Sequence, residues 1–194
     1  LRECLEQNPG IRGIMLGSHG LFTWGDTAKE CYINSLDVIE ACANYLEDNY
    51  GKNRAIFGGQ KIESLEPKDR QSQAAKIAPI LRGFCSSERH MIGHFTDDHR
   101  VLEYINSNDL EKLAPLGTSC PDHFLRTKIQ PLILNLDKNE DLSDVDALKE
   151  KLAPLFEDYR AMYTDYYETC KHPNSPAIRD RNPVIIIYPG VGMF

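Results

Sequence analysis

His19 is the residue in this sequence best suited to chemistry. It follows an apolar run, residues 11–16, that predicts a short buried strand, and glycines flank it in Gly17-Ser18-His19-Gly20. Glycines beside an imidazole allow the backbone to turn sharply and leave the ring accessible. Neutral imidazole is the commonest protein ligand for zinc, so His19 is a candidate metal ligand. The alternative is a turn histidine that makes only a hydrogen bond.

A second group of reactive or anion-binding side chains lies further along the chain. Asp122, His123, Arg126 and Lys128 fall within one short segment. Arg126 and Lys128 could together hold a phosphate or a carboxylate, because both are cationic donors. Alternatively, Asp122 caps a turn after Pro121, and the basic pair forms salt bridges at a domain interface. The sequence leaves both roles open.

Three further histidines, His90, His94 and His99, also lie close together in the sequence. If His90 and His94 occupy one strand, their Cα atoms are roughly 13 Å apart, since a strand rises about 3.3 Å per residue. That separation is too large for both rings to bind one metal ion. We therefore assign no metal site to this segment.

Apolar patterns predict strands that alternate with helices, which indicates an α/β fold. Thr27 and Glu30 form a capping box that should start a helix, and Gly51 should end it. Pro79 should kink or end a later helix, and Pro154 should split another. Expected strands cover residues 11–16, 21–24, 90–95, 129–136 and 183–188, and expected helices cover residues 1–8, 27–50, 67–81, 97 onward, 108–113 and 143–170.

The composition is that of a globular protein. Of the 194 residues, 41% are hydrophobic, and the longest apolar run, residues 184–188, is too short to span a bilayer. A net charge of -7, with Lys and Arg scattered along the chain, excludes the basic surface of a nucleic-acid-binding protein. Six cysteines without a Cys-x-x-Cys pair favour a reducing, cytoplasmic location.

The segment around His19 carries a family resemblance. The stretch Gly13-Ile14-Met15-Leu16-Gly17-Ser18-His19-Gly20-Leu21-Phe22-Thr23-Trp24-Gly25 resembles the class II aldolase and adducin family, in which x-x-His-Gly-Leu-x-x-x-Gly precedes a long helix. The resemblance implies that His19 is the third histidine ligand of a catalytic zinc. The family's His-x-His pair, catalytic carboxylate and phosphate-binding loops lie upstream, and this sequence contains no His-x-His. We therefore expect an incomplete zinc site.

The reaction that this resemblance implies is a retro-aldol cleavage. Zinc chelates the carbonyl and hydroxyl oxygens of a ketose phosphate and stabilises the enediolate that forms when the carbon–carbon bond breaks. A catalytic zinc needs about three protein ligands and an open position, which one imidazole cannot supply. The chain alone should therefore lack aldolase activity.

The second half of the chain resembles a more specific group. Residues 117–128 and 182–194 look like the connecting region of bifunctional proteins that join a rhamnulose-1-phosphate aldolase to a short-chain alcohol (lactaldehyde) dehydrogenase. The resemblance covers nearly all of residues 89–194. It implies that the NAD-binding glycine-rich turn and the Tyr-x-x-x-Lys pair lie downstream. Gly190-Val191-Gly192 should be a tight turn, because a lone Gly-x-Gly is weak evidence for a phosphate site.

These observations together predict a fold and a function. We expect a partial class II aldolase-like α/β layer over residues 1–66, followed by a smaller βα connecting unit over residues 67–194 that leads to a dehydrogenase domain. Leu1 and Phe194 suggest that the chain is a piece of a longer polypeptide. That parent should cleave rhamnulose 1-phosphate, or a similar deoxyketose phosphate, and use zinc and NAD. We expect a small-molecule sugar phosphate as partner, a homo-oligomeric parent, and no nucleic acid or membrane.

Two rival functions remain. The first is an adducin-like, non-catalytic binding module in which His19 holds no metal. The second is an independent Rossmann-like dehydrogenase domain built from residues 89–194.

Overall fold

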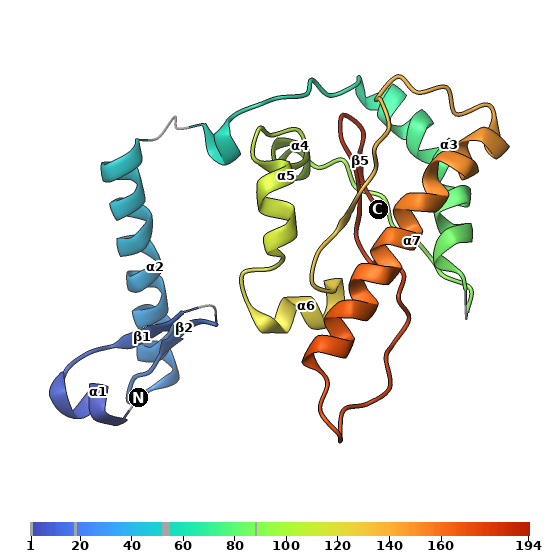
Figure 1. Ribbon diagram of the computed structural model, residues 1–194. Helices are drawn as coiled ribbons and strands as arrows, with labels where there is room; N and C mark the ends of the chain where they lie inside the picture. Colours follow the sequence, from blue (N-terminus) through green and yellow to red (C-terminus); the bar gives the residue numbers. More distant parts are fainter. Residues whose placement is uncertain (1, 18, 52–54, 88) are drawn as a thin grey trace. The chain divides into compact units, whose positions relative to one another are not determined.

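The structure is a computed structural model that describes residues 2–17, 19–51, 55–87 and 89–194. It contains two compact units (Figure 1). Residues 1–54 and 119–122 form the first unit, and residues 55–118 and 123–194 form the second. The two units are distinguished by their internal spatial contacts. The expected boundary between residues 66 and 67 concerns functional domains and stays a prediction.

The first unit combines a β-hairpin with a long helix. After α1 (Arg2–Gln7), β1 (Gly13–Leu16) pairs antiparallel with β2 (Gly20–Thr23), and α2 (Ala28–Tyr50) follows. The Thr27 hydroxyl accepts a hydrogen bond from the Glu30 amide at 3.1 Å, as the capping box predicts. The Glu30 carboxylate accepts from the amide of Asp26 at 2.9 Å. The predicted helix and both predicted strands are confirmed.

The apolar face of α2 has the predicted helical spacing but is not covered by other described residues of the first unit. Asn34 is the buried residue of this helix. The large apolar side chains that recur along α2 are exposed: Tyr32, Leu36, Ile39, Leu46 and Tyr50. Periodicity therefore predicted the helix correctly, and the described residues of the first unit supply no apolar partner for its face.

The second unit is mainly helical and contains a small sheet. β3 pairs parallel with β4, with Leu132 opposite Ile186, and β4 pairs antiparallel with β5. The elements in chain order are η1 (Ile56–Gly58), α3 (Pro67–Cys85), α4 (His99–Ile105), α5 (Leu110–Leu113), η2 (Ala114–Leu116), α6 (Pro121–Thr127), β3 (Leu132–Ile133), α7 (Val145–Cys170), β4 (Ile186–Tyr188) and β5 (Gly192–Met193).

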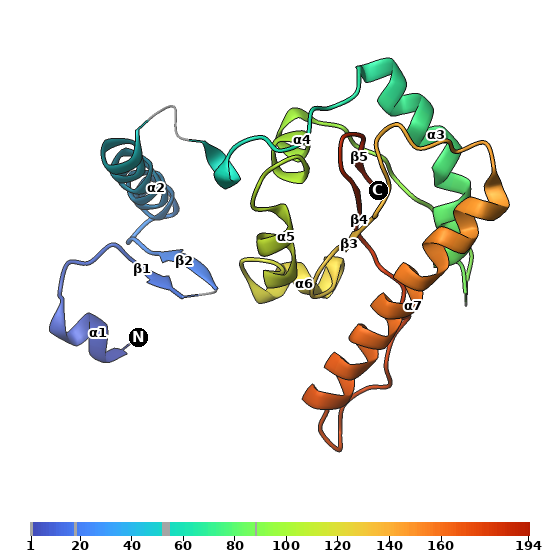
Figure 2. The ribbon, with the colours of Figure 1, turned by 45° about the horizontal axis from the view of Figure 1, so that its top comes forward.

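The sheet separates two apolar cores. Ile186 and Tyr188 of β4 belong to the core that includes buried residues of α3 and α7, whereas Ile187 belongs to a core with residues of α4 and α5. This alternation is expected because successive side chains of a strand point to opposite faces. Figure 2 shows α3 and α7 on one side of the strands and α4 and α5 on the other. A mixed α/β fold is thus confirmed.

Two predictions about local structure were wrong. Residues 90–95 do not form a strand. Both backbone groups of Met91 bond to side chains instead: its amide donates to Ser86 Oγ, and its carbonyl accepts from Arg82 Nε. Pro154 does not split α7. α3 also continues through Pro79, where the prediction was that the helix would kink or end. Each proline is flanked by residues of the first core, and burial of those residues offsets the lost backbone hydrogen bond.

Three strands are shorter than predicted. β1, β3 and β4 occupy only parts of residues 11–16, 129–136 and 183–188. α6 was not predicted as a helix. Among the described residues, no helix has the length and apolar character needed to cross a membrane.

Candidate functional site

His19 lies in the turn of the β1–β2 hairpin. Ser18, which precedes it, is outside the described residues. The His19 amide donates to the carbonyl of Leu16 at 3.1 Å, and the exposed imidazole stacks on Phe22 with ring centroids 5.7 Å apart. Gly20 follows with φ +142°, a conformation that other residues rarely adopt. The turn therefore presents the ring to solvent, as the flanking glycines predicted.

Two close approaches in this unit require glycine. A Cβ on Gly13 would lie 2.8 Å from the Phe22 carbonyl oxygen of the partner strand. A Cβ on Gly25 would lie 2.7 Å from the backbone nitrogen of Cys31, in the first turn of α2. Glycine at position 25 thus lets β2 pass directly into the helix.

Polar contacts attach the hairpin to α2. The Thr23 hydroxyl lies 2.6 Å from Ser35 Oγ, and the side-chain amide of Asn34 donates to the Trp24 carbonyl at 2.7 Å. Asn34 is only 5% exposed, so this bond also satisfies a buried polar group. The orientation of β2, and with it the turn that carries His19, depends on these contacts.

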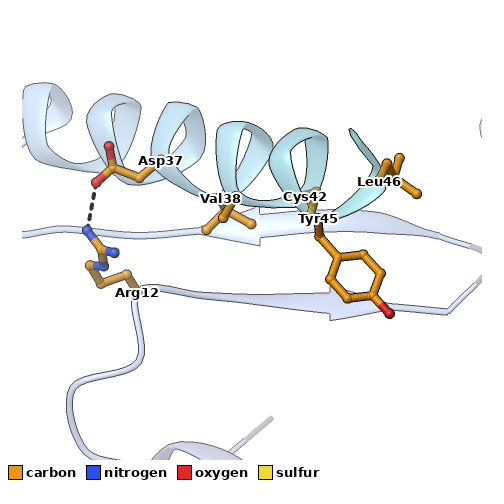
Figure 3. Close-up of a pocket in the computed structure, with 7 residues that line it drawn as sticks. Arg12, Asp37, Val38, Cys42, Tyr45 and Leu46 are labelled. Atoms are coloured by element: carbon orange, nitrogen blue, oxygen red, sulfur yellow. Dashed lines mark hydrogen bonds and ion pairs between the residues drawn. The ribbon is translucent and has the colours of Figure 1, made fainter. Parts of the chain in front are cut away.

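A cavity of about 470 Å³ lies beside α2 in the same unit (Figure 3). One end carries the ion pair between Arg12 and Asp37, with 2.7 Å between nitrogen and oxygen. The remaining lining is mostly apolar: Val38, Ala41, Cys42, Tyr45 and Leu46. His19 is not part of this lining. The paired charges and apolar wall offer no evident acid, base or metal site.

The described residues do not complete a zinc site around His19. No group of three or more His, Cys, Asp or Glu side chains is placed to hold a metal ion in the described part of the chain. His90, His94 and His99 are covered by that statement. One exposed imidazole is a suitable ligand but an insufficient set.

The four residues of the second candidate site have different surroundings. Asp122 is grouped with the first unit, and the other three with the second. His123 and Arg126 are exposed on α6, whereas Lys128 is half-buried directly after that helix. Arg126 and Lys128 both line a second cavity, of about 430 Å³.

Lys128 points into the protein. Its ammonium group donates to the carbonyls of Asp180 and Asn182 and lies 4.2 Å from the centre of the Tyr163 ring. Burial lowers the pKa of Lys128, an effect that nearby Asp180 partly offsets. Its backbone φ is +64°, which is uncommon for a residue other than glycine.

Gly190-Val191-Gly192 forms the turn between β4 and β5, as a tight turn was predicted. Gly190 has φ +81°, and the Val191 amide donates to the Tyr188 carbonyl at 3.0 Å. The buried side chain of Asn106 accepts from the Gly190 amide at 2.6 Å and donates to Ser64 Oγ at 2.8 Å. No sequence pattern had indicated that Asn106 would hold this turn.

The second unit carries the family match. The family described as the second domain of class II aldolases matches residues 72–194. The chain belongs to this family. The match includes the small sheet, α7, most of α3 and the cavity beside Lys128. It does not include the His19 hairpin.

A longer relative extends the similarity of this class II aldolase segment to the hairpin. A protein of Bacillus subtilis (strain 168) named "Uncharacterized oxidoreductase YuxG" is 32% identical over 193 residues. The match covers 100% of this chain and 27% of that relative, so the chain spans about a quarter of the relative's length. No solved structure matches the chain.

Proposed function

We propose that this chain acts within a bifunctional enzyme. Its aldolase activity cleaves rhamnulose 1-phosphate, or a similar deoxyketose phosphate, into dihydroxyacetone phosphate and lactaldehyde. A short-chain dehydrogenase domain elsewhere in the polypeptide uses NAD to oxidise or reduce the aldehyde. We propose a cytoplasmic homo-oligomer.

The family match is the observation that carries this proposal. It supports aldolase chemistry for the polypeptide that contains residues 72–194. The relative is named an oxidoreductase and is much longer than this chain, which supports a fused second activity. The specific sugar rests on the sequence resemblance of the connecting region.

His19 is proposed as one of three histidine ligands of zinc. The support is its exposed position on the hairpin turn, where it stacks on Phe22, and its match to the family pattern. The residues described here do not fit a complete zinc site, since they contribute one imidazole. The other two ligands must come from another part of the polypeptide.

Replacement of His19 in the full-length protein tests this role. We expect His19→Ala to lower bound zinc to well below one atom per subunit. It should reduce formation of dihydroxyacetone phosphate by about 100-fold or more, since loss of even an outer-shell partner of a metal ligand typically costs about 10- to 100-fold. His99→Ala is the matched control, because the His99 side chain is 81% exposed and lies on α4. Bound zinc and cleavage that survive in His19→Ala would exclude the proposed role.

The two rivals predict different results. An adducin-like binding module would contain no stoichiometric zinc and release no triose phosphate. An independent dehydrogenase at residues 89–194 would need a glycine-rich turn that opens a helix, and Gly190-Val191-Gly192 instead opens β5. NAD binding that is lost on deletion of residues 89–194 and retained after deletion of every other domain would favour that rival.

A further inference from the structure

The cavity beside Lys128 has the size and lining of a small-molecule site. Its volume of about 430 Å³ falls within the range of ligand pockets, about 300 to 1,000 Å³. It is lined within the second unit by α6, α7 and the segment that precedes β4. Its charged and aromatic lining residues include Arg126, Lys128, Tyr163, Tyr166, Arg179 and Asp180.

The cavity is cationic in an acidic chain. Its lining contains Arg89, Arg126, Lys128 and Arg179 against one carboxylate, Asp180, which gives a net charge of +3. The whole chain has a net charge of -7. A concave surface lined by one sign of charge raises the local concentration of ions of the opposite sign.

Lys128 helps to build the cavity. Its ammonium group is occupied by the carbonyls of Asp180 and Asn182, so it joins the end of α6 to the segment before β4. The Asp180 carboxylate accepts from the backbone amide of Asn182 at 2.8 Å. Both groups are thus committed to protein contacts.

Arg89, Arg126 and Arg179 are the donors left for a ligand. All three are exposed, and among the described residues none of their guanidinium groups has a hydrogen bond or an ion pair. A guanidinium donates in a planar fork that matches phosphate and carboxylate oxygens.

Tyrosines supply most of the aromatic part of the lining. The Tyr163 and Tyr166 rings lie with centroids 6.0 Å apart, both half-buried. Tyr163 is fixed by the Lys128 ammonium on its face, whereas Tyr166 makes no such contact. Aromatic walls bind the apolar faces of ring-shaped ligands.

We propose that this cavity binds a small phosphate monoester. Arg126 and Arg179 bind the phosphate, with Arg89 as a further cationic donor, and Tyr166 contacts the organic group. The cavity lies in the second unit and His19 in the first, and the proposal does not rest on the proposed aldolase reaction.

Isothermal titration calorimetry on the full-length protein tests the site, with inorganic phosphate, glycerol 3-phosphate and adenosine monophosphate as probes. We expect saturable binding of the esters that weakens as salt is added. Arg126→Ala and Arg179→Ala should each weaken binding about tenfold, the effect of losing a charge-assisted hydrogen bond. Arg100→Glu, an exposed charge reversal on α4 outside this lining, should bind as the unmodified protein does.

Tyr166→Ala separates the two halves of the proposal. It should weaken binding of the phosphate ester with a ring and leave binding of inorganic phosphate unchanged. Equal affinity of all probes would overturn the role of Tyr166. Absence of binding at millimolar ligand would overturn the site. So would unaffected binding in an Arg126→Glu/Arg179→Glu double variant whose circular dichroism is unchanged. Because the experiment measures binding, a failure of the proposed aldol cleavage would leave this test of the site unchanged.

Discussion

The two units differ in what holds them together. Every buried hydrophobic residue among those described lies in the second unit, between Ala74 and Val191. The first unit relies on hairpin pairing and on polar contacts such as Asn34 to Trp24. A typical hydrogen bond contributes about 0.5 to 1.5 kcal/mol, whereas a buried large apolar side chain contributes about 1.5 to 3.

The comparison teaches that the two candidate sites have different structural origins. The His19 turn is set by local hairpin geometry. The cavity beside Lys128 is set by packing between segments that are far apart in the sequence. Four experiments can sharpen or break this contrast.

The largest expected difference is between truncations of apolar side chains in the two units. Phe156 is fully buried and stacks on Phe84 at 4.6 Å, so Phe156→Ala should lower the free energy of unfolding of its unit by about 3 to 5 kcal/mol. Leu36→Ala, at an exposed position of α2, should cost about 0.5 kcal/mol or less if nothing covers that face. Urea unfolding measures both. A large cost for Leu36→Ala would show that another segment or chain covers α2.

Asn106 tests the polar interior of the second unit. Asn106→Ala leaves the buried Gly190 amide without its acceptor and should cost about 1 to 3 kcal/mol. Asn49→Ala in the first unit removes an exposed bond to the Tyr45 carbonyl and serves as the control. Similar urea midpoints for the two variants would contradict the contrast between the units.

The alkaline pH dependence should also differ between the units. Burial raises the pKa of the Cys85 thiol from 9.0 to about 11, with nearby Asp180 adding to the effect. A thiol whose pKa is raised by folding is stabilising below pH 9, and this stability is lost as the pH rises from 9 to 11. The loss should be about 1 to 2 kcal/mol, allowing for partial solvent screening.

Cys85→Ala should therefore show a smaller fall in stability between pH 9 and pH 11 than the unmodified protein. Cys42→Ala, on the exposed surface of α2, should leave the pH profile unchanged. Denaturant titrations at several pH values give the comparison. Parallel profiles for all three proteins would rule out Cys85 as the group that titrates.

The smallest effect concerns the start of α2. Thr27→Ala removes the N-cap acceptor of the Glu30 amide and should destabilise the helix by about 1 kcal/mol. Hydrogen exchange of the amides in the first turn of α2 should accelerate about fivefold. Exchange in α7, which has its own cap at Asp144, should not change.

Much of the fold followed from local signals. Thr27 and Gly51 marked the ends of α2, and the glycines around His19 marked a turn that exposes its ring. The sequence also drew attention to Arg126 and Lys128. It did not show that Lys128 turns inward, or that Arg179 and Tyr166 join Arg126 in one lining. Those facts depend on contacts between distant segments, which no local pattern contains.

By itself, the sequence determined features that depend on interactions between residues close in the sequence. These are the helix caps, the hairpin turns and the spacing of apolar residues along α2 and α7. Only the tertiary structure decided that α3 and α7 continue through Pro79 and Pro154, and that residues 90–95 are not a strand. The reason is that burial in a shared core offsets a broken backbone hydrogen bond. Strand formation likewise requires a neighbouring strand, which the chain supplies only after it has folded.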